Sequence, residues 1–184
     1  MSLLARVRGG LALASVLSCA MFGALSGSGP ATVISIGGMM YPELIKQGYD
    51  EEKMCGLIAT AGTLGPIIPP SIVMVFYGTV TGVSITQMFA GGIGAGLLLA
   101  LALFGVTIFL ANKEKWPKWD SSVEKPKVWP TFKESFWALL MPVIVLGGIY
   151  GGFFTPTEAA AVSVFYAFFV GGFIYKELDL KNVM

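Results

Sequence analysis

The stretch Gly62-Thr63-Leu64-Gly65-Pro66-Ile67-Ile68-Pro69-Pro70 decides the fold of this chain. It lies inside residues 54–112, a long segment without a single Asp, Glu, Lys or Arg. Three prolines and two glycines in this run prevent a regular helix, because proline lacks the backbone N–H and glycine is a poor helix former. At membrane depth an unwound backbone is tolerated only when protein buries it or when it lines a polar cavity. The run therefore predicts a discontinuous membrane helix over residues 54–80.

The charges of the whole chain point to the same environment. Charged residues make up only 12% of the 184 residues and hydrophobic residues 55%, whereas a soluble domain carries about 25% charged residues. A helix needs about 20 apolar residues to cross a bilayer. These numbers predict an all-α, polytopic membrane protein. Its charge-free stretches are residues 9–42, 54–112, 135–157 and 159–175.

A second interruption, Ser26-Gly27-Ser28-Gly29-Pro30, divides the first apolar segment. The arms on either side, residues 10–25 and 31–40, would be about 24 Å and 15 Å long, too short for a hydrocarbon core of about 30 Å. A re-entrant helical hairpin over residues 10–40 fits these lengths. It also places all 12 Lys and Arg on one side of the membrane, as the positive-inside rule favours.

Residues 41–53 read as a polar connector between the two interrupted segments. Pro42 suits the first turn of a short helix, and Gly48 suits its C-terminal cap. Asp50 is the expected N-cap of the next helix.

Capping motifs predict three further transmembrane helices after the broken one. Ser84, Thr131 and Thr155 each precede an acidic or amide residue by three positions, which is typical of a helix start. The helices are expected over residues 84–112, 132–153 and 156–175. A cytoplasmic loop over residues 113–131 joins the first two, and it brings three tryptophans suited to the membrane interface, Trp116, Trp119 and Trp129.

Several classes of protein are disfavoured by what the chain contains. Histidine is absent, and no paired carboxylates or metal-ligand cluster can be found, so an enzyme is not expected. The net charge of +1 gives no reason to expect a nucleic-acid partner. Cys19 and Cys55 lie in apolar surroundings and are interpreted as packing residues. Arg6 and Arg8 precede an apolar run, but the membrane segments that follow argue against a signal peptide.

The two interruptions together suggest a binding site. A serine-rich tip and an unwound helix rich in Gly, Thr and Pro expose backbone carbonyls and hydroxyls at membrane depth, and such oxygens can coordinate Na⁺. The alternative is that both are only packing kinks. Glu158 adjoins an apolar segment, but its place in a capping motif explains it structurally.

These residues also resemble a known family. The Ser26–Thr32 and Gly62–Ser71 runs, the connector ending Gly48-Tyr49-Asp50, and Thr155-Pro156-Thr157-Glu158 look like motifs of the large membrane subunit of TRAP (tripartite ATP-independent periplasmic) transporters, the DctM-like proteins. The resemblance covers nearly the whole chain. Family members are much longer, so the chain looks like a fragment that runs from the first hairpin to the start of a second repeat.

The resemblance implies a multi-pass protein of the bacterial inner membrane that takes up organic acids, such as C4-dicarboxylates or sugar acids, by Na⁺ symport. It implies no cofactor besides the coupling ion. The expected partners are a small membrane subunit and a periplasmic substrate-binding protein, and a core that moves like an elevator against a scaffold is implied as well. The implied Na⁺ ligands, mainly backbone carbonyls, are Ser26, Ser28, Gly62, Thr63 and Gly65, and the implied substrate contacts are Ser28, Thr32 and Ser71.

Two other interpretations stay open at this point. One is an ion-coupled anion or carboxylate carrier that needs no binding protein. The other is a structural membrane protein that transports nothing.

Overall fold

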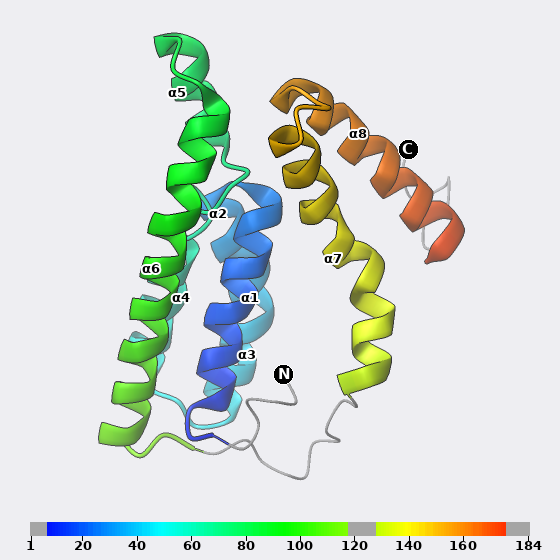
Figure 1. Cartoon of the computed structure of the whole chain (residues 1–184). Helices are drawn as coiled ribbons and strands as arrows, with labels where there is room; N and C mark the ends of the chain where they lie inside the picture. The colour runs from blue at the N-terminus through cyan, green and yellow to red at the C-terminus, as the bar shows by residue number, and fades with distance from the viewer. Residues whose placement is uncertain (1–6, 118–127, 176–184) are drawn as a thin grey trace. The chain divides into compact units, whose positions relative to one another are not determined.

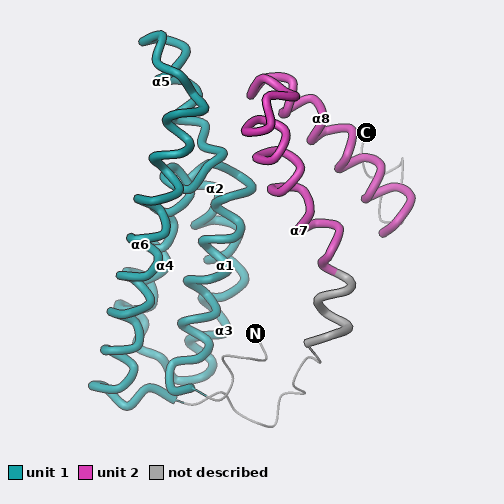
Figure 2. The backbone as a smooth tube through the Cα atoms, in the orientation of Figure 1, with its two compact units in different colours: residues 1–128 teal, residues 129–184 magenta. Residues whose placement is uncertain are grey.

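A computed structural model describes residues 7–117 and 128–175, and every regular element within these ranges is helical. The chain divides into two compact units, residues 1–128 and residues 129–184 (Figure 2).

Unit 1 is a small bundle built around the two interruptions (Figure 1). The first helix ends where Gly27 adopts a left-handed φ of +61°, and the chain then turns back so that the following helical segments pack against α1. A third pass is broken between α4 and α5, and α6 packs against both α1 and α5. The elements are α1 (Gly10–Ser26), α2 (Gly29–Thr32), a π-helical turn (Val33–Gly37), α3 (Gly38–Lys46), α4 (Glu51–Gly62), α5 (Ile72–Thr81) and α6 (Ile85–Lys113).

The returning arm of the hairpin is longer than expected. Helical structure continues from Gly29 to Lys46, so Pro42 lies inside α3 and does not open a separate short helix. The expectation of an arm ending at residue 40 was therefore wrong. The π-helical turn Val33–Gly37 lies just before the proline, and local widening of this kind allows helices with proline to continue. The polar connector shrinks to the few residues around Gly48, which has a left-handed φ of +83° as expected for a cap.

The predicted helix starts in unit 1 are confirmed by their caps. The Asp50 carboxylate accepts from the Lys53 N–H at 3.0 Å, and α4 begins at Glu51. The Ser84 hydroxyl accepts from the Gln87 N–H at 3.4 Å, and α6 begins at Ile85. The expected interruption lies between Gly62 and Ile72.

The core of unit 1 is formed where α1, α3, α4 and α6 face one another. Buried apolar side chains from each of these helices make one cluster, and Cys19 is fully buried within it. Among them are Leu11, Val16, Leu44, Met54, Ile58, Leu64 and Leu103.

The charged end of unit 1 gathers chain segments that are distant in sequence. The Pro117 carbonyl accepts hydrogen bonds from the Gly9 N–H and the Tyr49 hydroxyl, both at 3.3 Å. Lys53 at the start of α4 pairs with Glu114 after α6. Consequently α1 begins, α3 ends, α4 begins and α6 ends at the same end of the unit (Figure 1). The outgoing arm of the hairpin, α1, therefore begins at the same end of unit 1 at which its returning arm, α3, ends.

Trp116 also lies at this end, where it is 5% exposed and buried in the core cluster. The turn after α6 folds the indole back onto the protein, and the expected place of Trp116 at the membrane interface stays a prediction. The side chains of Trp119 and Trp129 lie outside the described residues, as does most of the expected loop over residues 113–131.

Unit 2 contains α7 (Val128–Tyr150), α8 (Pro156–Phe169) and a π-helical turn (Val170–Ile174). The capping box at Thr155 is complete, since its N–H donates to the Glu158 carboxylate at 2.8 Å and its hydroxyl accepts from the Glu158 N–H. The predicted structural role of Glu158 is confirmed. The Tyr166 hydroxyl donates to the Trp137 carbonyl at 2.7 Å and joins the two helices.

The predicted bounds of α7, residues 132–153, were wrong at both ends. The helix begins at Val128, so Thr131 is not its N-cap; Pro130 falls in the first turn, where no N–H donor is needed. It ends at Tyr150 because Gly152 takes a left-handed φ of +73° and the N–H groups of Phe153 and Phe154 bond back to the Gly148 carbonyl.

Two of the described helices are long and apolar enough to cross a membrane: Ile85–Lys113 and Pro156–Ile174. Shorter apolar helices span Gly10–Ser26, Ile72–Thr81 and Ser135–Tyr150. The all-helical class agrees with the sequence, whereas the number of spanning helices stays a prediction.

Candidate functional site

The tip of the hairpin and the break of the third pass lie directly against each other. The Gly27 carbonyl accepts from the Ile72 N–H at 3.4 Å, which joins the end of α1 to the start of α5. Gly65 lies against the Ser28 backbone so closely that a Cβ on Gly65 would be 2.8 Å from the Ser28 carbonyl oxygen. The sequence-based expectation that the two interruptions form a pair thus agrees with the packing. We call this contact the joint; it consists of residues 26–32 and 62–72.

Glycines make the joint possible. A Cβ on Gly27 would lie 2.6 Å from the Pro70 carbonyl oxygen, and one on Gly23 would lie 2.9 Å from Gly65 Cα. A Cβ on Gly29 would come within 3.2 Å of the Gly62 carbonyl oxygen. Because backbone lies on both sides, these contacts cannot be relieved by rotating a side chain. Two polypeptide backbones therefore approach as closely as they can only where glycine is present.

The hydroxyls at the tip form a small network. Thr32 Oγ1 donates to the Ser28 carbonyl at 2.7 Å and lies 3.2 Å from Ser26 Oγ, which itself lies 3.3 Å from the same carbonyl. Ser28 Oγ accepts from the Ala31 N–H at 3.4 Å and caps α2. Three of the predicted ligand residues, Ser26, Ser28 and Thr32, are thus brought together within one turn.

The break contributes the remaining predicted residues. Ser71 Oγ donates to the Pro66 carbonyl at 2.7 Å and accepts from the Met74 N–H, so it both closes the unwound loop and caps α5. Gly62 and Gly65 line the contact with the tip. Thr63 is exposed and donates to the Thr60 carbonyl at 2.7 Å, at the edge of the joint rather than inside it.

The exposure of these side chains separates their roles. Thr32 is 0% and Ser71 1% exposed, and both hydroxyls are bonded to backbone carbonyls within unit 1. Within unit 1 the two hydroxyls stabilise the backbone turns of the tip and the break. The predicted contact of Thr32 and Ser71 with a substrate stays a prediction. Ser26 and Ser28 are half-buried.

The chemistry available at the joint is that of neutral oxygens. Every hydrogen-bonding group named there is a backbone carbonyl, a backbone N–H or a hydroxyl. Over residues 7–117 and 128–175, no three His, Cys, Asp or Glu side chains gather as a possible metal cluster. A monovalent cation can be held by such neutral oxygens, whereas Ca²⁺ sites in proteins are built with carboxylates.

Helix α6 supports the break from the side, which the sequence indicated only in part. Two of its glycines pack against the break: a Cβ on Gly92 would lie 2.9 Å from the Ile67 carbonyl oxygen, and one on Gly96 would lie 2.7 Å from Ile68 Cγ1. Gly91 and Gly94 face open space. Gly92 and Gly96 share one face of α6, but Ala90 and Gly94, or Gly91 and Ala95, have the same spacing of four residues, so the sequence alone did not identify the packed face.

The family model of the DctM component of the tripartite ATP-independent periplasmic transporters matches residues 1–184. The chain is 51% identical over 171 residues to the C4-dicarboxylate TRAP transporter large permease protein DctM of Vibrio cholerae, covering 93% of this chain and 38% of that protein. It is 43% identical to the DctM protein of Rhodobacter capsulatus, over 95% of this chain and 43% of that protein. It is 35% identical to the sialic acid TRAP transporter permease protein SiaT of Haemophilus influenzae, over 99% of this chain and 29% of that protein.

The chain thus spans less than half the length of these curated relatives. They are named as permeases rather than enzymes, which confirms the expectation that no enzyme is encoded here.

Proposed function

Because the chain belongs to the family of the DctM component of tripartite ATP-independent periplasmic transporters, we propose that it forms part of the transport core of a Na⁺-coupled importer of organic acids. The observation that carries the proposal is the joint, where an interrupted hairpin and an interrupted helix meet backbone to backbone. Such interruptions place carbonyls and N–H groups at membrane depth, where secondary transporters bind their substrates and coupling ions.

The charge distribution of unit 1 supports a re-entrant hairpin in the bacterial inner membrane. The charged residues between positions 7 and 117 lie at positions 8, 43–53 and 113–115, at one end of the unit, and the joint lies away from them. Since the hairpin begins and ends at that charged end, its tip points into the apolar part of the protein. Na⁺ at the joint would be held by carbonyls and hydroxyls of Ser26, Ser28, Gly62, Thr63 and Gly65.

Relatives of this chain are named for different solutes, including C4-dicarboxylates, sialic acid and ectoine. For this chain we propose an organic acid, delivered by a periplasmic binding protein and transported together with a small membrane subunit. The highest identity among the relatives described above is to a C4-dicarboxylate permease, which makes a C4-dicarboxylate the first substrate to test.

The transport test uses a chimera, because the chain spans 38% of the Vibrio cholerae relative. Residues 10–113 of this chain replace the matching segment of that permease, and the complete transporter is reconstituted with its small subunit and binding protein. We expect uptake of radiolabelled succinate in Na⁺ and its loss when choline replaces Na⁺. Equal uptake in choline, with the unmodified relative assayed as the control, would overturn Na⁺ coupling.

Cation binding can also be tested on this chain alone, since Cys19 is buried and Cys55 exposed. In a C55A variant a maleimide reaches Cys19 only when unit 1 opens, and a cation that binds the closed form slows the reaction by mass action. We expect slower labelling in Na⁺ than in choline at equal ionic strength, by about tenfold at ten times the dissociation constant. Identical rates in the two salts would argue against a Na⁺ site in this half of the transporter.

A further inference from the structure

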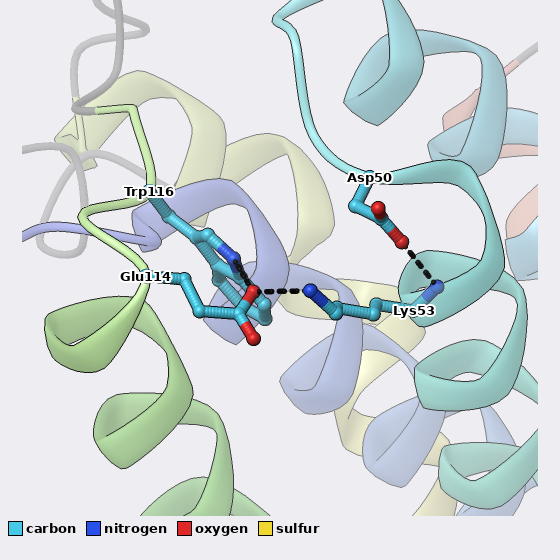
Figure 3. Close-up of polar contacts among 4 residues, drawn as sticks. All are labelled: Asp50, Lys53, Glu114 and Trp116. Atoms are coloured by element: carbon cyan, nitrogen blue, oxygen red, sulfur yellow. Dashed lines mark hydrogen bonds and ion pairs between the residues drawn. The ribbon is translucent and has the colours of Figure 1, made fainter.

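At the end of unit 1 that carries the charges, one carboxylate oxygen joins two segments of the chain (Figure 3). Glu114 Oε2 accepts from Lys53 Nζ at 2.8 Å and from Trp116 Nε1 at 2.9 Å. The backbone of Lys53 is itself fixed, because its N–H donates to the Asp50 carboxylate. The ion pair therefore links the first turn of α4 to the end of α6 at a partly exposed position, where the side chains of Lys53 and Glu114 are 45% and 26% exposed.

Beneath the ion pair lies a buried aromatic layer. Tyr49 and Trp116 are 4% and 5% exposed, and their rings meet edge to face with centroids 5.5 Å apart. The Tyr49 hydroxyl and the Gly9 N–H both donate to the Pro117 carbonyl. These contacts bring the start of α1, the connector before α4 and the end of α6 together. We call the set Gly9, Tyr49, Lys53, Glu114, Trp116 and Pro117 the clasp.

A strained turn builds the clasp. Lys115 has a φ of +54°, in the left-handed region that glycine normally occupies at the end of a helix. The turn lets the Trp116 N–H bond to the Ala111 carbonyl at 3.0 Å, and it folds the indole back onto Glu114 and Tyr49. A left-handed lysine is unfavourable, so surrounding contacts must hold it there, and the clasp provides them.

The clasp connects the same three helices that meet near the joint. Helix α1 leads into the tip, α4 leads into the break, and α6 supports the break through Gly92 and Gly96. Between these two ends α6 packs against α1 through core residues such as Leu103 and Ala111. The clasp adds a polar connection to α4 at the far end of α6, which limits how far that end can tilt on this apolar packing.

We propose that Lys53 and Glu114 are positioning residues for transport: through the clasp they hold α6 so that its glycine face keeps the break against the hairpin tip. The proposal deepens the proposed function, on which it rests, because it assigns a role at the joint to two residues far from it. A merely stabilising pair would change how easily unit 1 unfolds, but not the arrangement of its helices when folded.

The test measures that arrangement directly. In a C19A/C55A background, spin labels are attached to I34C on the returning arm and G91C on α6, since Ile34 is 74% exposed and Gly91 faces open space. Pulsed electron paramagnetic resonance then gives the distance distribution between the arm and α6 in the folded protein. We expect E114Q to broaden the distribution at least about twofold, because α6 then samples more than one orientation.

Two matched variants sharpen the result. E52Q removes one negative charge from the first turn of α4, where Glu52 acts on Lys53 through its charge alone and makes none of the hydrogen bonds of the clasp, and it should leave the distribution unchanged. The exchange variant K53E/E114K restores an ion pair of reversed polarity but not the bond from Trp116, because an ammonium group accepts no hydrogen bond, and it should narrow the distribution in part relative to E114Q. An E114Q distribution as narrow as that of the parent, even with a lowered melting temperature, would overturn the proposal and leave a purely stabilising ion pair.

The distance distribution in the C19A/C55A background and the maleimide labelling of Cys19 in the separate C55A variant together distinguish this proposal from the proposed function. If adding Na⁺ changes neither the distance distribution nor the Cys19 labelling rate, the proposed Na⁺ site in unit 1 is overturned. The proposal for Lys53 and Glu114 is then still decided by the effect of E114Q on the distance distribution. If Na⁺ slows Cys19 labelling but E114Q leaves the distance distribution between the returning arm and α6 unchanged, the proposed Na⁺ site is supported and the proposal for Lys53 and Glu114 is overturned.

Discussion

The joint and the clasp fasten unit 1 in opposite ways. At the joint the contacts are between backbones, and the glycines succeed because they have no side chain. At the clasp the contacts are made by long side chains, an ion pair over a pair of aromatic rings. The difference follows the surroundings: within the apolar part only neutral groups are inexpensive to bury, whereas at the charged end water can solvate Lys53 and Glu114. Under the proposed function, neutral and weakly binding oxygens at the joint would suit an ion that must be released again.

The largest effect is expected from a methyl group placed at the joint. In Gly27→Ala the new Cβ would meet the Pro70 carbonyl oxygen at 2.6 Å, and the residue would keep a φ of +61°. We expect a loss of about 3–4 kcal/mol in the free energy of unfolding, from about 1–2 kcal/mol of left-handed strain plus overpacking. Unfolding by SDS in mixed micelles measures it.

Gly82→Ala is the matched control for this prediction. Gly82 ends α5 with a φ of +74°, but nothing lies within 4 Å of its added Cβ. The variant should lose only the part of the free energy of unfolding that comes from left-handed strain, about 1–2 kcal/mol. Equal losses in the two variants would mean that the close approach of tip and break contributes nothing.

At the clasp, Trp116→Ala should have the next largest effect. The indole is 5% exposed and rests on Tyr49, so its removal leaves a cavity and should cost about 3 kcal/mol in the same titration. Trp116→Phe keeps most of the ring and loses only the bond to Glu114, so about 1 kcal/mol is expected. If both variants cost the same, the hydrogen bond rather than the packing carries the contribution of Trp116.

These two fastenings also differ in how far the sequence could predict them. The joint could be anticipated because its signals are local: Gly and Pro at 62–70 break a helix wherever they occur. The clasp could not, because Lys53 and Glu114 are 61 positions apart and nothing in either neighbourhood indicates the other. Likewise α3 continues through Pro42 after a π-helical turn, and the turn that leads to the buried Trp116 contains a left-handed lysine. Both are backbone adjustments that residue preferences argue against.

The same left-handed lysine offers a way to strengthen the clasp. Lys115→Gly should raise the free energy of unfolding by up to about 1 kcal/mol, since glycine adopts a φ of +54° without steric strain. The exposed Lys115 side chain takes no part in the contacts of the clasp described above, so they should persist. Glycine is the residue that usually takes a left-handed conformation after a helix, as Gly82 does after α5. A destabilised K115G variant would indicate that the lysine side chain has a role of its own.

The smallest effect is expected from a change of pH, which should alter the contribution of the clasp to the free energy of unfolding but not that of the joint. The Glu114 carboxylate has a pKa below its ordinary value of 4.5, first because Lys53 donates to it and next because Trp116 does, with Lys113 adding a favourable charge. A lowered pKa in the folded state means that this stabilisation is fully present above about pH 4.5 and is lost as the pH falls through the folded value.

The pKa of Lys53 is raised above its ordinary value of 10.5, first by its hydrogen bond to Glu114 and then by the charges of Glu114, Asp50 and Glu52. The contribution of Lys53 to the free energy of unfolding is therefore lost only as the pH rises through that higher value. Comparing the parent with E114Q by SDS titration from pH 7 to pH 3 isolates the pair: their difference should shrink toward zero at the acid end. Because the joint is built from groups that do not titrate, the difference between Gly27→Ala and Gly82→Ala should stay constant over the same range. A difference between the two glycine variants that also collapsed in acid would show that joint and clasp are not separate fastenings but one cooperative unit.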